Sequence, residues 1–189
     1  IYSTSLAQVN CNTFTTDQCR ESCEKSNFAE KIQWTQYAQE LFDEAIKLCP
    51  TNDFAFKEKA VPYLKSGDFV TWKKLIDKAV ELDPQKNLGY RGWCKFQFLR
   101  DYSGAIRDLE ALKKYYPEDL GRSQNGDYNL GIVKAMSYSA LGQKEKAAGI
   151  IERLLARKAY VKGMYDHYQL GVTSVSYTHL RAHETSLQL

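Results

Sequence analysis

The sequence contains few of the residues that interrupt regular structure: 4 prolines and 11 glycines among 189 residues. So small a share excludes a disordered or linker-rich chain. No stretch approaches the roughly 18 consecutive apolar residues of a membrane-spanning helix. The net charge of +3 comes from Lys and Arg scattered among Asp and Glu, whereas nucleic-acid-binding domains usually carry a basic stripe. With 43% hydrophobic residues, the composition fits a folded domain that buries its own core.

Residues with catalytic chemistry are also scarce. The sequence has 3 histidines but no Gly-x-Ser-x-Gly elbow, no Gly-rich phosphate loop and no His-Glu-x-x-His. Before the last residues of the chain, only His167 could serve a Ser–His or Cys–His pair, and it follows the pattern of an ordinary helix residue. Acidic pairs such as Asp43-Glu44 fall on expected helix surfaces, where they are solvated. We therefore expect no enzyme activity, no cofactor and no metal ion.

The chain has 5 cysteines, which are Cys11, Cys19, Cys23, Cys49 and Cys94. Three of them crowd the N-terminus. In an exported protein, two of these three could pair with each other, or one could pair with Cys49. A zinc site is disfavoured because there is no Cys-x-x-Cys pair and no histidine nearby. Cys94 falls at an internal helix position for a small apolar residue, which predicts a buried thiol.

The first residues resemble the end of a secretory signal peptide. Ser5 and Ala7 are small residues at the −3 and −1 positions for cleavage before Gln8. The basic and apolar regions of such a peptide are not in the sequence, so a plain N-terminal extension is an equal alternative. We treat residues 1–15 as this signal remnant and extension. The expected location is periplasmic or secreted in a bacterium, with the cytoplasm as the alternative.

An internal repeat is visible in the spacing of three prolines. Pro50, Pro84 and Pro117 are separated by 34 and 33 residues, and each follows a segment with helical character. A proline suits the position just after a helix, because it cannot continue the backbone hydrogen bonding. The stretch from Leu120 to Asp127, rich in Gly, Ser and Asn, predicts an elongated loop before the last repeat.

Between the prolines, each repeat divides into two amphipathic helices around a turn. In one repeat, Phe56, Ala60 and Tyr63 share a helix face; a turn follows at residues 66–68. The second helix of that repeat carries Trp72, Ile76 and Ala79 at the same spacing. Two further repeats follow the same plan, with turns at residues 100–101 and 141–143. The segment from Thr16 to Cys49 is the least regular repeat and suits a cap.

These features resemble the tetratricopeptide repeat, a helix–turn–helix unit of about 34 residues. The family's small first-helix slot is matched by Ala60, Cys94 and Ala135, and its proline slot by Pro50, Pro84 and Pro117. Departures are Trp72, where alanine is usual, and Gln97, where tyrosine is usual. The resemblance implies an all-α fold over residues 16–173: an α-solenoid of stacked antiparallel helix hairpins wound into a right-handed superhelix.

The resemblance also implies where a partner would bind. First helices of such hairpins line a concave groove, and the contact slots map to Phe54, Lys57, Val61, Leu88, Arg91, Lys95, Asn129, Ile132 and Met136. A basic centre at Lys57, Arg91 and Lys95 would suit an acidic peptide, although these are equally explained as ordinary exposed cations. The family's clamp for C-terminal carboxylates needs Lys and Asn pairs. Val61 stands where an Asn is required, so we expect no chaperone binding.

The last residues carry a different signal. Val175 to Thr185 resemble one reading frame of a transposon sequencing adapter, so we interpret residues 174–189 as a non-native tail. His179, His183 and Glu184 would otherwise form a metal-binding pattern on a helix. The sequence thus predicts a non-catalytic scaffold that binds a protein or peptide, without nucleic acid or membrane insertion. The alternative is the repeat region of a larger protein whose enzymatic or membrane domain lies outside this fragment.

Overall fold

The structure, a computed structural model, describes residues 9–174. Its α-helices are α1 (Asp17–Lys31), α2 (Gln36–Leu48), α3 (Asp53–Ser66), α4 (Phe69–Leu82), α5 (Pro84–Cys94), α6 (Tyr102–Leu112), α7 (Leu130–Ala140) and α8 (Lys144–Leu155). A 3-10 turn η1 (Cys11–Thr13) precedes them, a π-helical turn η2 (Lys95–Leu99) follows α5, and residues 166–174 are helical. Within the described residues there is no strand, only one isolated bridge between Arg122 and Asn129. The predicted all-α helical-repeat fold is confirmed.

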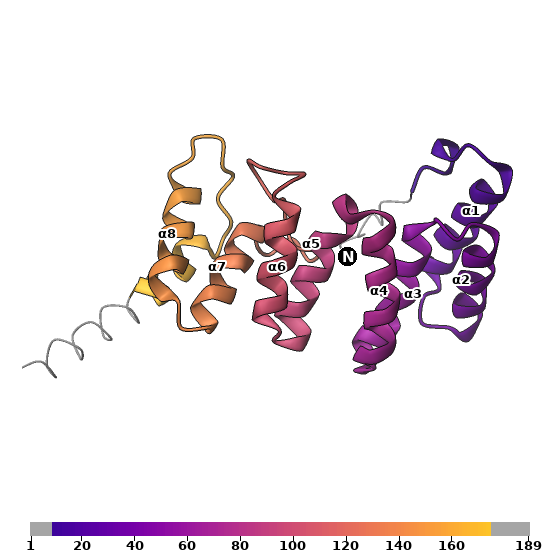
Figure 1. The fold of residues 1–189 in the computed structure, drawn as a ribbon, viewed down its shortest axis with the longest axis horizontal. Coiled ribbons are helices and arrows are strands. Elements are labelled where there is room, and N and C mark those ends of the chain that lie inside the picture. Colours follow the sequence, from indigo (N-terminus) through magenta and orange to yellow (C-terminus); the bar gives the residue numbers. More distant parts are fainter. Residues whose placement is uncertain (1–8, 175–189) are drawn as a thin grey trace, which may run out of the picture. The chain divides into compact units, whose positions relative to one another are not determined.

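The chain divides into two compact units, residues 1–87 (unit 1) and residues 88–189 (unit 2), and the division falls within α5. In unit 1, α1 packs against α2 and α3 against α4; in unit 2, α7 packs against α8 (Figure 1). The range 16–173, expected as one repeat domain, therefore contributes to both units. The hand of a superhelix over the whole array stays a prediction.

Polar side chains fix where most of the helices begin. Thr16, Thr35, Asn52, Asp68 and Asp101 each accept a hydrogen bond from a backbone N–H three residues later. This satisfies one of the N–H groups that have no partner inside the first turn of a helix. The expected turns at residues 100–101 and 141–143 lie between helices, and the one at residues 66–68 begins with the last residue of α3. Local chemistry thus sets the hairpin boundaries.

Unit 1 is built on small residues at the helix crossings. Ala29, Ala38, Ala45 and Ala55 are fully buried beside Leu41 and Phe42. Trp72, where the family has alanine, is also completely buried on α4. Alanines let neighbouring helices approach closely, whereas Trp72 contributes a large apolar side chain to the core of the second hairpin.

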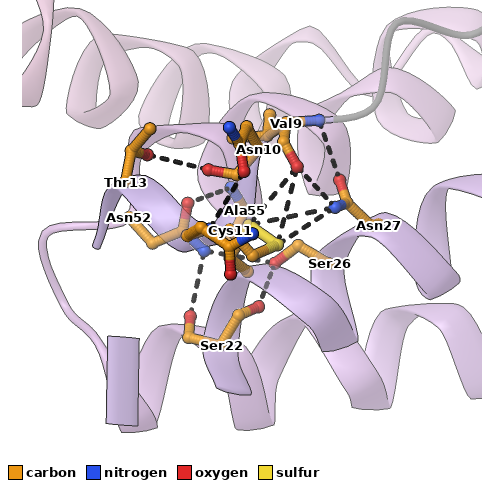
Figure 2. The surroundings of a disulfide bond; sticks show 11 residues. Val9, Asn10, Cys11, Thr13, Ser22, Ser26, Asn27, Asn52 and Ala55 are labelled. Carbon is orange, nitrogen blue, oxygen red and sulfur yellow. Dashed lines mark hydrogen bonds between the residues drawn. A yellow bond between two sulfur atoms is a disulfide. The ribbon is translucent and has the colours of Figure 1, made fainter. Parts of the chain in front are cut away.

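Two disulfides hold the start of unit 1: Cys11–Cys23 and Cys19–Cys49, with Cα–Cα separations of 5.5 and 4.9 Å. Both of the pairings left open by the sequence therefore occur. Figure 2 shows that Asn27 reinforces the first one, because its amide donates to the Val9 carbonyl at 2.9 Å and accepts from the Val9 N–H at 3.2 Å. Cys94 is completely buried, as predicted.

A buried polar network lies beside these disulfides and ties the first hairpin to α3. The Asn52 amide, which also caps α3, donates to the Ser22 hydroxyl at 2.9 Å (Figure 2). Ser22 in turn donates to the Ala45 carbonyl at 2.7 Å. All of these partners are buried, so each bond satisfies a group that water does not reach. The disulfides and this network together fix α1 against α2 and α3.

The hairpin of α7 and α8 forms the core of unit 2, with Ile132, Ala135, Tyr138, Ala147 and Ile151 buried between the helices. The two helices approach closely near Gly131: a Cβ built there would lie 2.8 Å from Leu154 Cδ1. Only a glycine fits this position without moving its neighbour. No helix among the described residues is long and apolar enough to cross a membrane.

The loop between α6 and α7 is ordered by its own hydrogen bonds, and it includes the loop predicted at residues 120–127. The Asn129 amide donates to Asp119 Oδ1 at 2.6 Å, and the Leu130 N–H donates to the Gly121 carbonyl at 2.8 Å. Ser123 N–H donates to the Tyr128 carbonyl at 2.8 Å. This loop is therefore a fixed wall beside the start of α7.

Candidate protein-binding surface

On α3, the three predicted contact residues of unit 1 lie on one helix face and are partly exposed. Phe54, Lys57 and Val61 are spaced by three and four residues, so they project from the same side. The Lys57 ammonium lies 5.9 Å from the centre of the Phe54 ring and 3.1 Å from Glu58 Oε1. Its charge is therefore already balanced by a neighbouring carboxylate, and the face is apolar with a neutralised centre.

A carboxylate cluster adjoins this face. Glu58 is buried, and the Gln33 amide donates to both its Oε2 at 2.9 Å and its backbone carbonyl at 3.1 Å. Burial raises the pKa of Glu30, and repulsion from Glu58 raises it further. Carboxylates from α1 and α3 therefore lie beside Lys57, so the α3 face has less net positive charge than its lysine alone would suggest.

In unit 2, Arg91 and Lys95 converge on one buried carboxylate. Asp108 of α6 accepts from Arg91 Nε at 2.9 Å and from Arg91 Nη2 at 2.6 Å, and Lys95 Nζ lies 2.8 Å from Asp108 Oδ2. The side chains of Arg91 and Lys95 are only 16% and 14% exposed. The expected basic centre is thus a structural ion-pair cluster, and this corrects the electrostatic part of the sequence-based interpretation.

Asp108 was missed by the sequence analysis, although a signal was present. It lies on the inward face of α6 beside Leu109 and three residues after Ala105, so a charged residue occupies a core position. A buried carboxylate requires cationic or hydrogen-bonding partners. Its presence therefore implied that cations of the preceding helix would turn inward.

Three of the predicted contact residues are not surface side chains. Leu88 and Asn129 are each 5% exposed, and Ile132 is completely buried. Asn129 caps α7 and bonds to Asp119, and Ile132 belongs to the α7–α8 core. Met136, the remaining predicted contact on α7, packs at the edge of that core and is partly exposed. The family spacing alone did not distinguish the side chains that point into the core from those that reach the surface.

The residues considered for metal binding or acid–base chemistry have other surroundings in the part of the chain that the structure describes. Among the described residues there is no group of three or more His, Cys, Asp or Glu able to hold a metal ion. His167 is exposed, and the adjacent Asp166 accepts from Tyr160 Oη and the Gly163 N–H, both at 2.7 Å. Burial and this hydrogen bond raise the pKa of Tyr160. Asp166 thus closes a turn, while His179, His183 and Glu184 lie outside the described residues.

Comparison with known proteins locates one repeat. Residues 90–119 match the tetratricopeptide repeat family model. The chain is 32% identical over 101 residues to the Hsp70-Hsp90 organizing protein of Triticum aestivum, a match that covers 52% of this chain and 17% of that protein. The Hsp70-Hsp90 organizing protein 3 of Arabidopsis thaliana is also 32% identical over 101 residues, covering 52% and 18%. The chain therefore spans less than a fifth of either relative, and its matched repeat contains both Arg91 and Asp108.

Proposed function

We propose that this chain is a non-catalytic scaffold that binds a protein or peptide through the first helices of its hairpins. The observation that carries the proposal is the α3 face, where Phe54 and Val61 remain partly exposed beside a charge-balanced Lys57. An apolar face of this kind can receive apolar side chains of an extended or helical peptide. The matched repeat and the co-chaperone relatives agree with an interaction role.

The structure gives less support for an acidic partner than the sequence analysis suggested. Lys57, Arg91 and Lys95 each have a carboxylate of this chain within about 3 Å, namely Glu58 or Asp108. An acidic peptide would have to compete with Glu58 on the α3 face, and with Asp108 at Arg91 and Lys95 of unit 2. We therefore propose that apolar contacts dominate on the α3 face. Absence of a chaperone C-terminal clamp remains our prediction, because Val61 supplies no amide.

We also propose that the protein is bacterial and exported. Two disulfides among residues 11–49 suit an oxidising compartment, since reducing cytosol seldom preserves such bonds. The test is to recover the protein from its source, unfold it in denaturant that contains a thiol-blocking reagent, and count modified cysteines by mass spectrometry. Blocking at Cys94 alone supports the proposal, whereas blocking at Cys11, Cys19, Cys23 and Cys49 contradicts it and favours the cytoplasm.

The second candidate is the repeat region of a larger protein with an enzymatic or membrane domain elsewhere. The observation that favours it is the partial coverage of both relatives, which are several times longer than the matched stretch. Sequencing the source locus upstream and downstream of this coding region distinguishes the two candidate functions. Further helical repeats favour the scaffold; a new domain or a long apolar segment favours the larger protein.

The face itself is tested with a matched pair of substitutions. Val61→Glu places a charge on the proposed face of α3, and Val70→Glu makes the same change on α4, where Val70 is 69% exposed. Crosslinked partners captured from the source are quantified for both variants and for the unchanged chain. Loss of the same partners with Val61→Glu and retention with Val70→Glu supports the proposal. Equal capture by all three, with helical content intact, overturns it.

A further inference from the structure

A hollow of about 140 Å³ lies in unit 2, at the end of α6, the start of α7 and the last turns of α8. It is bounded by the ordered loop that follows α6. Small-molecule sites are usually about 300–1,000 Å³, so this volume is too small for a cofactor. At roughly 30 Å³ for each water, it holds only a few waters or one side chain. A docked peptide could therefore place no more than one side chain inside it.

The walls of the hollow combine cationic and apolar side chains. Lys113, Lys134, Arg153 and Arg157 line it together with a single carboxylate, that of Glu118. Leu120, Ile150 and Leu154 supply the apolar part of the lining. A carboxylate beside an apolar side chain is the complement of such a site, because the cations attract the charge and the apolar lining excludes water.

The four cations that line the hollow differ in whether an acceptor group of this chain already lies beside them. Lys134 lies 3.1 Å from Glu110, and Arg157 donates to the Glu118 carbonyl and lies 3.9 Å from its carboxylate. Glu118 itself is 91% exposed, so it provides little counter-charge inside the hollow. Lys113, at the end of α6, and Arg153, in the last turn of α8, both line the hollow and are exposed, and neither is paired with Glu110 or Glu118. These two are therefore the anchors for an incoming carboxylate.

We propose that this hollow binds an acidic side chain of a partner peptide, with its carboxylate between Lys113 and Arg153 and an adjacent apolar side chain on Leu154. The hollow shares no lining residue with the α3 face of Phe54, Lys57 and Val61. On α7 it is lined by Gly131 and Lys134, and Met136 is not among its lining residues. Asn129, one of the predicted contact residues, also lines the hollow. The acidic partner expected from the sequence is thus assigned to a different set of cations.

The first experiment measures binding of a short fluorescent peptide in which leucines alternate with glutamates, using the full chain at low salt. We expect saturable binding that weakens about tenfold in Lys113→Glu/Arg153→Glu, since each tenfold change corresponds to about 1.4 kcal/mol. The matched control is Arg107→Glu/Lys162→Glu, which removes two exposed cations of unit 2 outside the hollow. No binding by the unchanged chain, or equal weakening in both variants, overturns the proposal.

A second measurement does not depend on a variant folding. A carbodiimide joins a lysine amine to a carboxylate without a spacer, so peptide bound as proposed should crosslink mainly at Lys113. Crosslinks spread evenly over the lysines of the chain would contradict the site. A glutamine version of the peptide should not bind, and a phosphoserine version that binds more than tenfold tighter than the glutamate peptide would overturn the assignment to a carboxylate.

Discussion

The two units share the helix-hairpin plan but are held together by different physical means. Unit 1 carries both disulfides, and they join α1 to the η1 segment and to the end of α2. The described part of unit 2, residues 88–174, has no disulfide and instead has Asp108 between Arg91 and Lys95. A disulfide acts mainly by restricting the unfolded chain, whereas a buried ion pair acts in the folded state and carries a desolvation cost. The same fold therefore tolerates different reinforcement in its two parts.

Removing the disulfides is expected to have the largest effect, confined to unit 1. Replacing Cys11 and Cys23, and in a second variant Cys19 and Cys49, with serine should cost about 2–4 kcal/mol each. The second pair closes 30 residues and the first closes 12, so the second should cost slightly more. Amide hydrogen exchange resolves this by unit, with Cys94→Ala as the control. Equal loss of protection in α1 and α8 would contradict the separation.

Breaking the ion-pair cluster should destabilise unit 2 by nearly as much. Asp108→Asn leaves Arg91 and Lys95 largely buried without their carboxylate, which is expected to cost about 3 kcal/mol. The control is Asp77→Asn in unit 1, where the ion pair with Lys73 lies at the surface and contributes less than about 1 kcal/mol. Urea unfolding measures both. A similarly small loss of unfolding free energy in both variants would show that the Asp108 ion pairs do not stabilise unit 2.

Two glycines of the α7–α8 hairpin should respond in opposite directions to alanine. At Gly131 the added methyl meets Leu154 Cδ1 at 2.8 Å, so Gly131→Ala should cost about 1 kcal/mol. At Gly149, within α8, the nearest atom is Arg153 Nη1 at 3.4 Å, so Gly149→Ala should gain about 0.5–1 kcal/mol from the better helix propensity. Thermal unfolding distinguishes the signs. A gain at both positions would contradict the close helix approach.

The smallest expected effect is the pH dependence contributed by Glu30. Its pKa is raised in the folded state, so the folded chain binds its proton more tightly than the unfolded chain does. Stability from this group therefore falls as pH rises from its ordinary value of 4.5 through the raised value. Glu30→Gln should remove that slope and stabilise unit 1 at neutral pH by no more than about 1 kcal/mol. An unchanged slope would exclude Glu30 as its source.

Much of the candidate site was accessible from the sequence, and the misses have one cause. The family spacing selected Phe54, Val61 and Met136, which are partly exposed on α3 and α7. It also selected Arg91 and Lys95, whose side chains turn to Asp108, and Ile132, which is buried in the core. Position along a helix fixes a face only relative to the helix axis. Which neighbour covers that face depends on packing.

What the sequence determined by itself was the repeat and its helices. Capping residues, turn residues and apolar spacing act over a few neighbours along the chain, so they can be read without knowing the fold. Which of the five cysteines pair, which cations lie beside a carboxylate of this chain, and which side chains line the hollow were decided only by the tertiary structure. These features join residues far apart in sequence. Disulfide formation and charge pairing depend on their distance in space, which the packing of the helices sets.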